Sequence, residues 1–310
     1  MIKRTLCFSN PAYLSLKNDQ LIIKLPEVEN NETLPDSFKQ QAVKSIPIED
    51  IGVIVIDNKQ ITFTSGLMEA LLEHNCALIT CNSSRMPAGL LLPLEKNTVQ
   101  SERFTAQIEA SSPLKKQLWQ QTVQTKILNQ SAVLKKYRNA EIGNMLKWTN
   151  EVKSGDSENL EGRAAAYYWK MLFSDIEGFT RGREGIPPNN LLNYGYAILR
   201  AVVARALVSS GLLPTLGIHH HNRYNAYGLA DDIMEPYRPF VDILVLQMVD
   251  SSKYIQELNK ELKTYLLQIP IIEVIINDKR SPLMVAVAQT TGSLAKCFSG
   301  ERRKLVYPIL

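Results

Sequence analysis

The hydrophobic and polar positions follow two different periods along the chain, and the change falls near residue 95. Before it, short alternating or continuous apolar runs predict β-strands at residues 5–8, 13–16, 21–25, 53–56, 77–81 and 85–92. The β-branched run at 53–56 predicts a strand buried on both faces. Pro87 favours a sheet edge for the last strand, because proline donates no backbone hydrogen bond. Residues 27–37 are polar and proline-flanked, and they predict an exposed loop.

Beyond Pro93 the spacing becomes helical. Apolar residues recur every three or four positions over 107–134, and the pattern continues at 140–153, 160–173, 191–210 and 239–249. Gly195 lies inside one of these helices, where glycine costs about 1 kcal/mol relative to alanine, so it predicts a close contact with a neighbouring helix. We therefore expect an α+β fold, with an N-terminal β-sandwich-like domain over residues 1–95 and a C-terminal α-helical domain over residues 96–310.

Two local features refine these helices. A shorter helix at 67–74 has Ser65 as its candidate N-cap, and Asn189 or Asn190 is a candidate cap for the helix at 191–210. Gly211 stands where a helix-terminating glycine belongs.

The composition limits the functional classes. The formal net charge of +4 permits a polyanionic partner without requiring one. The four cysteines form no C-x-x-C pair, which argues against a zinc site, and no P-loop, dinucleotide-binding, nucleophile-elbow or H-E-x-x-H motif occurs. The N-terminus lacks the apolar core of a signal peptide, and no uninterrupted apolar segment reaches the roughly 18 residues that span a bilayer. We expect a cytoplasmic protein with no membrane association.

The strongest chemical signal is a cluster of histidines and acids. Three of the four histidines are consecutive, and three acids follow them: His219, His220, His221, then Asp231, Asp232 and Glu235. Imidazole and carboxylate together hold divalent metals, which catalyse reactions of phosphate esters. The structural alternative is that the two aspartates begin a helix and Glu235 pairs with Arg238, three residues on.

Three further segments carry weaker signals. Glu161 shares a predicted helix face with small and apolar residues, yet an acid near a helix start also suits the helix dipole. Tyr194 and Tyr196 either pack in the core or stack on bases. The basic stretch over residues 296–304 is either a solvated tail or a phosphate-binding surface.

In this order, the segments resemble the CRISPR-associated integrase that inserts new spacers, particularly its type II branch. The matching stretches are L-E-G-R-A-A at 160–165, N-N-L-L-N-Y-G-Y-A at 189–197, G-I-H-H at 217–220 and L-A-D-D-I-M-E-P-Y-R-P at 229–239. The resemblance covers essentially the full chain. It implies a metal-dependent DNA endonuclease and integrase that inserts short foreign DNA fragments into a CRISPR array, by attack of a 3′-hydroxyl on the repeat border.

The resemblance also implies a ligand set of one glutamate, one histidine and one further acid. The matching positions are Glu161, His220 and Glu235, with Asp232, His219 and His221 as possible support. Carboxylates suit Mg²⁺ or Mn²⁺, and the imidazole favours Mn²⁺. The hypothesised phosphate contacts are Arg163, Arg223, Arg238, Lys296 and Arg302.

The partners implied by the resemblance are DNA, both as fragment duplex and as repeat, and other proteins. The N-terminal domain would form a homodimer, and the C-terminal domain would be catalytic. A small ferredoxin-like CRISPR-associated partner protein would bridge two dimers, and the type II effector nuclease would help to choose fragments. Two alternatives remain open: a stand-alone metal-dependent nuclease acting on branched or damaged DNA, and a non-catalytic DNA-binding scaffold.

Overall fold

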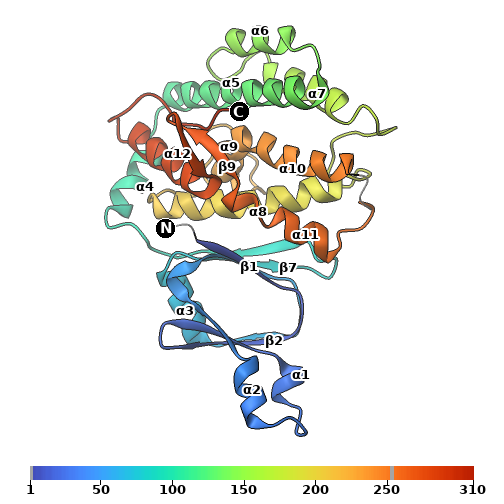
Figure 1. Ribbon diagram of the computed structural model, residues 1–310. Helices are drawn as coiled ribbons and strands as arrows, with labels where there is room; N and C mark the ends of the chain where they lie inside the picture. Colours follow the sequence, from blue (N-terminus) through green and yellow to red (C-terminus); the bar gives the residue numbers. More distant parts are fainter. Residues whose placement is uncertain (1–2, 252–254) are drawn as a thin grey trace. The chain divides into compact units, whose positions relative to one another are not determined.

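The chain forms two compact units with an α+β fold. The computed structural model describes residues 3–251 and 255–310, and the units are Met1–Lys96 and Asn97–Leu310 (Figure 1). The first unit carries two four-stranded sheets. The second is mainly helical. The dimerisation and catalytic roles that we assigned to the two regions remain predictions.

The sheets of the first unit differ in strand direction. One has the order β1 (Arg4–Phe8), β5 (Ile51–Ile56), β7 (Ala77–Cys81) and β8 (Pro87–Leu91), with β8 antiparallel and the other pairs parallel. The other has the order β4 (Lys44–Pro47), β3 (Gln20–Lys24), β2 (Ala12–Lys17) and β6 (Ile61–Phe63). As predicted, β5 is buried almost throughout and the strand that contains Pro87 lies at an edge.

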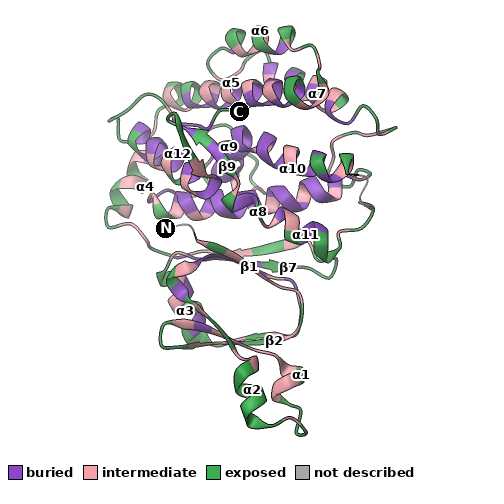
Figure 2. Cartoon of the chain, viewed as in Figure 1, coloured by how far each residue is buried: buried purple, intermediate pink, exposed green. Residues whose placement is uncertain are grey.

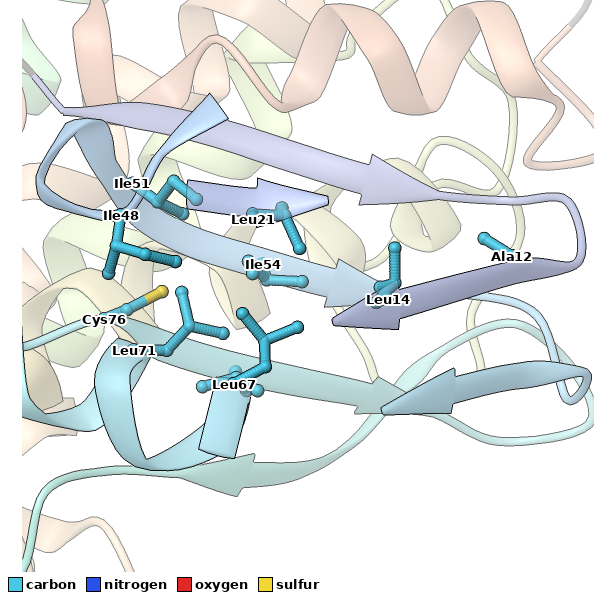
Figure 3. Packing of buried hydrophobic residues seen from close by; sticks show 10 residues of the cluster. Ala12, Leu14, Leu21, Ile48, Ile51, Ile54, Leu67, Leu71 and Cys76 are labelled. Carbon is cyan, nitrogen blue, oxygen red and sulfur yellow. The ribbon is translucent and has the colours of Figure 1, made fainter. Parts of the chain in front are cut away.

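Both sheets and helix α3 (Ser65–Glu73) contribute to one core (Figure 3). Leu14 from β2, Leu21 from β3, Ile54 from β5 and Leu67 from α3 are each at most 1% exposed. These four side chains bury apolar surface that no single sheet could cover. Burial of apolar surface stabilises the fold by about 25 cal/mol per Å². The two sheets are thus held together mainly by apolar contact.

The second unit is built around helix α8 (Asn189–Ser209). The other helices of this unit are α4 (Gln100–Ile108), α5 (Ser112–Arg138), α6 (Gly143–Glu151), α7 (Leu160–Leu172), α9 (Gly228–Met234), α10 (Arg238–Asp250), α11 (Lys260–Leu266) and α12 (Leu283–Phe298). Short 3₁₀ turns η2 (Glu235–Tyr237) and η3 (Ile269–Ile271) join them, and a third, η1 (Ile48–Asp50), precedes β5 in the first unit. Figure 2 shows α8 largely buried.

Helix α8 is the one helix, within the described residues, that is long and apolar enough to cross a membrane. Most of its apolar stretch is buried inside the protein. Contacts with α9, α10, α11 and α12 account for this burial. The apolar surface of α8 is therefore covered by other helices.

The second unit also contains a β-hairpin that the helical periodicity did not predict. Strands β9 (Glu273–Ile276) and β10 (Lys279–Pro282) pair antiparallel. Asn277 and Asp278 join them, and both have positive φ angles, of 49° and 58°. A two-residue loop with this conformation is typical of a tight hairpin turn. The Asn-Asp pair was therefore the feature of the sequence that could have predicted the hairpin.

The predicted loop at residues 27–37 was wrong in part. The segment is largely exposed, but α1 (Pro26–Glu29) and α2 (Asp36–Ala42) form within and beside it. Pro26 is the first residue of α1 and Pro35 directly precedes α2. Proline at a helix start loses no intrahelical hydrogen bond, so the prolines that we interpreted as loop signals begin helices here.

The predicted helix caps were also wrong. Ser65 is the first residue of α3, and the preceding Thr64 makes no side-chain cap hydrogen bond. Pro188 precedes α8 without a side-chain cap. The fully buried Asn189 amide instead donates to the carbonyl oxygens of Thr180 and Ile186, each at 2.9 Å. The loop before α8 is therefore held by a buried amide.

The expected close contact at Gly195 is confirmed. A Cβ atom at this position would lie 2.6 Å from Val241 Cγ1 on α10 and 3.3 Å from Ile269 Cδ1 in η3. Only a residue without a side chain lets α8 approach these neighbours so closely. The Gly211 prediction is confirmed as well, because it follows α8 with a φ of 73°.

We expect Gly195→Ala to lower the free energy of unfolding by about 1–3 kcal/mol, because the methyl group overpacks the contact with Val241. Gly292→Ala in α12 is the matched control, since nothing lies within 4 Å of an ideal Cβ there. Alanine should stabilise that helix by about 0.5–1 kcal/mol. Urea unfolding followed by circular dichroism measures both, and equal effects would contradict the contact.

Candidate active site

Two glutamates from separate elements converge on one lysine. Lys126 extends from α5, and its Nζ lies 2.6 Å from Glu235 Oε2 in η2 and also contacts Glu161 Oε1 in the first turn of α7. The side chains of Lys126 and Glu235 are 8% and 5% exposed, and that of Glu161 is 28% exposed. Arg238 Nη2 pairs with the other oxygen of Glu235, Oε1, at 3.0 Å. The structural alternative for Glu235, a pair with Arg238, therefore does form.

The start of α7 is fixed by its own backbone amides. The amides of Leu160 and Glu161 donate to the two carboxylate oxygens of Asp156, each at 2.9 Å. The Asn159 side chain accepts from the Gly162 amide as the N-cap. These contacts satisfy free donors of the first turn and so hold the position from which Glu161 extends.

The charges of the cluster keep both partners ionised. Burial lowers the pKa of Lys126, but the charges of Glu235 and Glu161 outweigh it and hold this pKa above its usual value. Burial raises the pKa of Glu235, and the charges of Arg238 and Lys126 overcome it, so the net direction is down. Both shifts favour the ion-paired forms at neutral pH.

His220 is oriented by Asp232. Its Nδ1 contacts Asp232 Oδ1, and the same fully buried carboxylate accepts the backbone amides of Ile218 at 2.7 Å and His219 at 2.9 Å. This hydrogen bond raises the pKa of His220 above its usual value, although burial opposes it. A histidine that donates through Nδ1 presents Nε2 to a metal or substrate, as metal-ligating histidines commonly do.

Steric crowding explains why residue 217, just before this loop, is a glycine. A Cβ at Gly217 would lie 2.6 Å from the carbonyl oxygen of His220 and 2.8 Å from Asp232 Oδ2. Any side chain there would push the loop away from the carboxylate that orients His220. The G-I-H-H stretch is therefore required in part by the close approach of backbone and Asp232.

The other histidines have different surroundings. The His219 ring stacks on Trp119 of α5, with centroids 4.1 Å apart and an interplanar angle of 1°. Burial lowers the pKa of His219, so the stacked ring favours its neutral form. His221 is exposed. The triplet thus splits into one oriented ring, one stacked ring and one solvated ring.

Asp231 belongs to a separate contact. Its carboxylate accepts from Arg200 Nε at 2.7 Å and from Asn225 Nδ2 at 2.8 Å. It ties α8 and the loop before α9 to α9 itself. The idea that Asp231 or Asp232 begins a helix was wrong, because α9 begins at Gly228 and both acids lie inside it.

The donor set fits a hard divalent cation. Two carboxylates contact the same ammonium group, and His220 lies near enough for the charge of Glu235 to act on it, so carboxylate and imidazole donors that suit Mg²⁺ or Mn²⁺ are present in one region. With the side chains as they stand, no group of three His, Cys, Asp or Glu residues in the described ranges is arranged to hold an ion. The Lys126 ammonium lies between the two carboxylates and supplies the positive charge there.

Comparison with known proteins identifies the family. Residues 6–277 match the family described as CRISPR associated protein Cas1. The chain belongs to this family. Over 294 residues it is 36% identical to the CRISPR-associated endonuclease Cas1 of Neisseria meningitidis serogroup C (strain 8013). The aligned region covers 94% of this chain and 91% of that protein. The resemblance inferred from four short segments is thereby confirmed.

Solved structures show the same fold. A casposase bound to integration product superposes with a TM-score of 0.77 at 20% identity, covering 98% of this chain and 92% of that chain. A Cas1 protein from Thermotoga maritima superposes with a TM-score of 0.71 at 18% identity, covering 96% and 97%. The α+β organisation described above is therefore that of Cas1 proteins.

Sequence reasoning missed Lys126 and Trp119 of the candidate site. Lys126 lies on the buried face of α5 with Val123 and Ile127, and a lone charge on such a face was the available signal. For Trp119 no sequence signal distinguishes a stacking partner from a core residue. Both residues come from a helix that none of the four matching segments includes.

The hypothesised phosphate contacts fall into two groups. Arg163, Arg223, Lys296 and Arg302 are exposed. The Arg238 side chain is only 26% exposed and is engaged by Glu235, with its guanidinium 4.8 Å from the centre of the Tyr196 ring. Contact with phosphate remains a prediction for all five, and Arg238 would have to make it from within the site.

A buried hydrogen-bond network supports the site from behind. Asp242 of α10 accepts from Tyr168 of α7 at 2.9 Å and from Tyr196 of α8 at 2.5 Å. Tyr196 is 6% exposed and Tyr194 is fully buried, so the core-packing interpretation holds for both. Since Arg238 covers the Tyr196 ring, the network connects α7, α8 and α10 to the ion pair of Glu235.

This network predicts a pH-dependent stability. Burial raises the pKa of Asp242 to about 7, although the hydroxyls of Tyr196 and Tyr168 oppose the shift. In the unfolded chain the carboxyl ionises at about pH 3.9. Between these values the folded state retains a proton that the unfolded state has released. The free energy of unfolding should therefore fall as pH rises, by up to about 1.4 kcal/mol per pH unit.

Asp242→Asn should remove this contribution. Urea unfolding of both proteins at intervals between about pH 4 and pH 7 measures it, where the pH window comes from the two pKa values. If the free energy of unfolding changes with pH equally in the variant and in the unaltered protein, then Asp242 is already ionised in the folded state.

Proposed function

We propose that this chain is a metal-dependent DNA integrase and endonuclease that inserts short foreign DNA into a CRISPR array. The convergence of Glu161 and Glu235, beside a histidine oriented by Asp232, is the observation that carries the proposal. The names of similar proteins support it. The relative in Neisseria meningitidis is called an endonuclease, and the casposase was solved bound to an integration product.

Glu161, Glu235 and Nε2 of His220 would hold the Mg²⁺ or Mn²⁺. When bound, such an ion polarises the scissile phosphate and stabilises charge that develops on the leaving oxygen. In strand transfer, the 3′-oxygen of the fragment forms a bond to phosphorus at the repeat border, and the phosphorus bond to the departing 3′-oxygen breaks. The attacking hydroxyl loses its proton and the leaving oxygen gains one. Water in place of the hydroxyl gives hydrolysis at the same site.

The chain's own residues prepare the site for this reaction. Asp232 holds the Nδ1 proton of His220 and so keeps Nε2 directed away from the buried carboxylate. Arg238 occupies Glu235 Oε1, which leaves Oε2 facing Lys126 and Glu161. These contacts would therefore keep two of the proposed ligands, His220 and Glu235, in orientation during the reaction.

We further propose the assembly that the family resemblance implies. The N-terminal units would form a homodimer, and a small ferredoxin-like partner protein would bridge two dimers on one DNA fragment, with the type II effector nuclease taking part in fragment choice. A Cas6-RT-Cas1–Cas2 complex supports a protein partner, because one of its chains covers 98% of this chain with a TM-score of 0.73. That match spans 36% of the larger chain.

Strand transfer tests the site directly. A duplex with 3′-hydroxyl ends, a supercoiled repeat plasmid, Mn²⁺ and the small partner protein are incubated, and joined products are quantified. Glu161→Gln, His220→Ala and Glu235→Gln should each reduce joining by about a hundredfold or more, since each removes a proposed metal ligand. Glu158→Gln is the control, because this exposed acid lies just before α7 and pairs only with Lys153 among the ion pairs of the described residues.

Two outcomes would contradict the proposal. Undiminished joining in Glu161→Gln and His220→Ala would exclude the metal site and favour a non-catalytic scaffold. Cleavage of branched DNA without joining, lost in the same variants, would favour the stand-alone nuclease.

Salt dependence tests the surface contacts. We expect a smaller salt dependence when one of these residues is replaced by glutamine: Arg163, Arg223, Lys296 or Arg302. Each single replacement should reduce the slope of log K for DNA binding against log salt concentration by about 1, because each residue that neutralises a phosphate releases a counterion. Fluorescence anisotropy with a labelled duplex measures the slope. Arg280→Gln is the control, since this arginine of β10 pairs with Glu273. A slope unchanged in the combined variant would remove these four residues from the DNA interface.

A further inference from the structure

The proposed ligand set does not by itself explain the buried position of Lys126. It lies on α5, its side chain is 8% exposed, and its ammonium contacts both acids of the proposed metal site. A lysine is rarely buried unless it is paired, and here both partners are the residues that a metal would require. The lysine and a divalent ion therefore compete for the same carboxylates.

The charges of the cluster balance without a metal. Glu161 and Glu235 carry two negative charges, and Lys126 and Arg238 carry two positive ones. A divalent ion added to these four side chains leaves two positive charges in excess among them. Asp232 beside His220 offsets part of that charge, and an arriving anion would offset the rest. The backbone phosphates of DNA are the anions that the proposed reaction brings to this point.

The two cations of the cluster are held differently. Arg238 pairs with Glu235 Oε1 and lies against the Tyr196 ring, so it has support on two sides. Among the ion pairs of the described residues, the Lys126 ammonium contacts only Glu161 Oε1 and Glu235 Oε2. A flexible four-carbon stem lets a lysine ammonium move while its backbone stays in place.

The backbone of Lys126 is fixed beside the site. Asn129, one turn further along α5, donates to the carbonyl oxygens of Pro236 at 2.9 Å and Pro308 at 3.1 Å. The first contact ties α5 to the turn that carries Glu235. The ammonium of Lys126 therefore stays within the reach of one side chain from the metal site, whichever partner it contacts.

From these contacts we propose that Lys126 is a tethered cation that exchanges with the divalent metal. It neutralises Glu161 and Glu235 before the metal binds, leaves them when the metal binds, and then contacts a phosphate of the DNA at the same site. Because the metal must displace Lys126, and DNA gives the displaced ammonium a new partner, the affinities for metal and DNA are coupled. The inference rests on the proposed function.

Metal binding without turnover tests the exchange. Mn²⁺ affinity is measured by electron paramagnetic resonance on the full chain, with and without a 3′-hydroxyl duplex. In the unaltered protein, DNA should raise Mn²⁺ affinity by about fivefold or more, which is the lower range of common coupling energies. Lys126→Met should bind Mn²⁺ more tightly than the unaltered protein without DNA, and DNA should add less than about twofold.

Two further variants separate charge exchange from folding. Lys126→Arg keeps the buried ion pairs, and because a guanidinium binds carboxylates in a planar, two-pronged manner, it should resist displacement and weaken Mn²⁺ binding without DNA. This variant tests the inference even if Lys126→Met fails to fold. Lys135→Met, at an exposed position of the same helix, should behave as the unaltered protein does.

The outcomes distinguish this inference from the proposed function. If Mn²⁺ binds, Glu161→Gln abolishes binding, and Lys126→Met and Lys126→Arg both match the unaltered protein, then the metal site stands and the exchange is wrong. If DNA raises Mn²⁺ affinity equally with and without the lysine, the coupling is wrong. If Mn²⁺ does not bind the unaltered protein, both the exchange and the metal-dependent function are wrong.

Discussion

The packing of the helical unit depends on one constraint: every buried carboxylate requires a hydrogen-bond or ion-pair donor. Among its described residues, the buried acids all lie on the segment from α9 to α10: Asp231, Asp232, Glu235 and Asp242. Each is met by groups from another element, namely Arg200 of α8, the histidine loop, Lys126 of α5, and the tyrosines of α7 and α8. An unpaired charge at any of these places would cost several kcal/mol, so these contacts determine how the helices are joined.

This arrangement links stability to chemistry. Well-packed apolar residues are often as stabilising as a buried ion pair, so the acids are not explained by stability alone. They hold a loop, an imidazole and two carboxylates at defined positions, which is the preorganisation that the proposed strand transfer would require. The Lys126 ammonium fits this view, because it keeps Glu161 and Glu235 together while their charges would otherwise repel.

Much of the fold could be predicted from local pattern. Strand and helix periodicity located most elements, because apolar spacing reflects which face is buried. The prediction failed where one residue type serves two purposes. Pro26 and Pro35 are signals for loops and equally for helix starts, and Asn189 is a cap by propensity but is buried here as a loop clamp. The hairpin at β9 and β10 is too short for its periodicity to stand out between helices.

For the site, the amino-acid sequence by itself determined which chemical groups are present: two glutamates, a histidine run and a glycine before it, in an order that matches the Cas1 family. It could not determine that Asp232 orients His220, that Trp119 stacks on His219, or that Lys126 separates the two acids. The first contact joins α9 to the histidine loop, and the second joins α5 to the same loop. Lys126 meets the two acids only because α5 packs against α7 and η2, since side chains far apart in sequence meet only when a shared core fixes their elements.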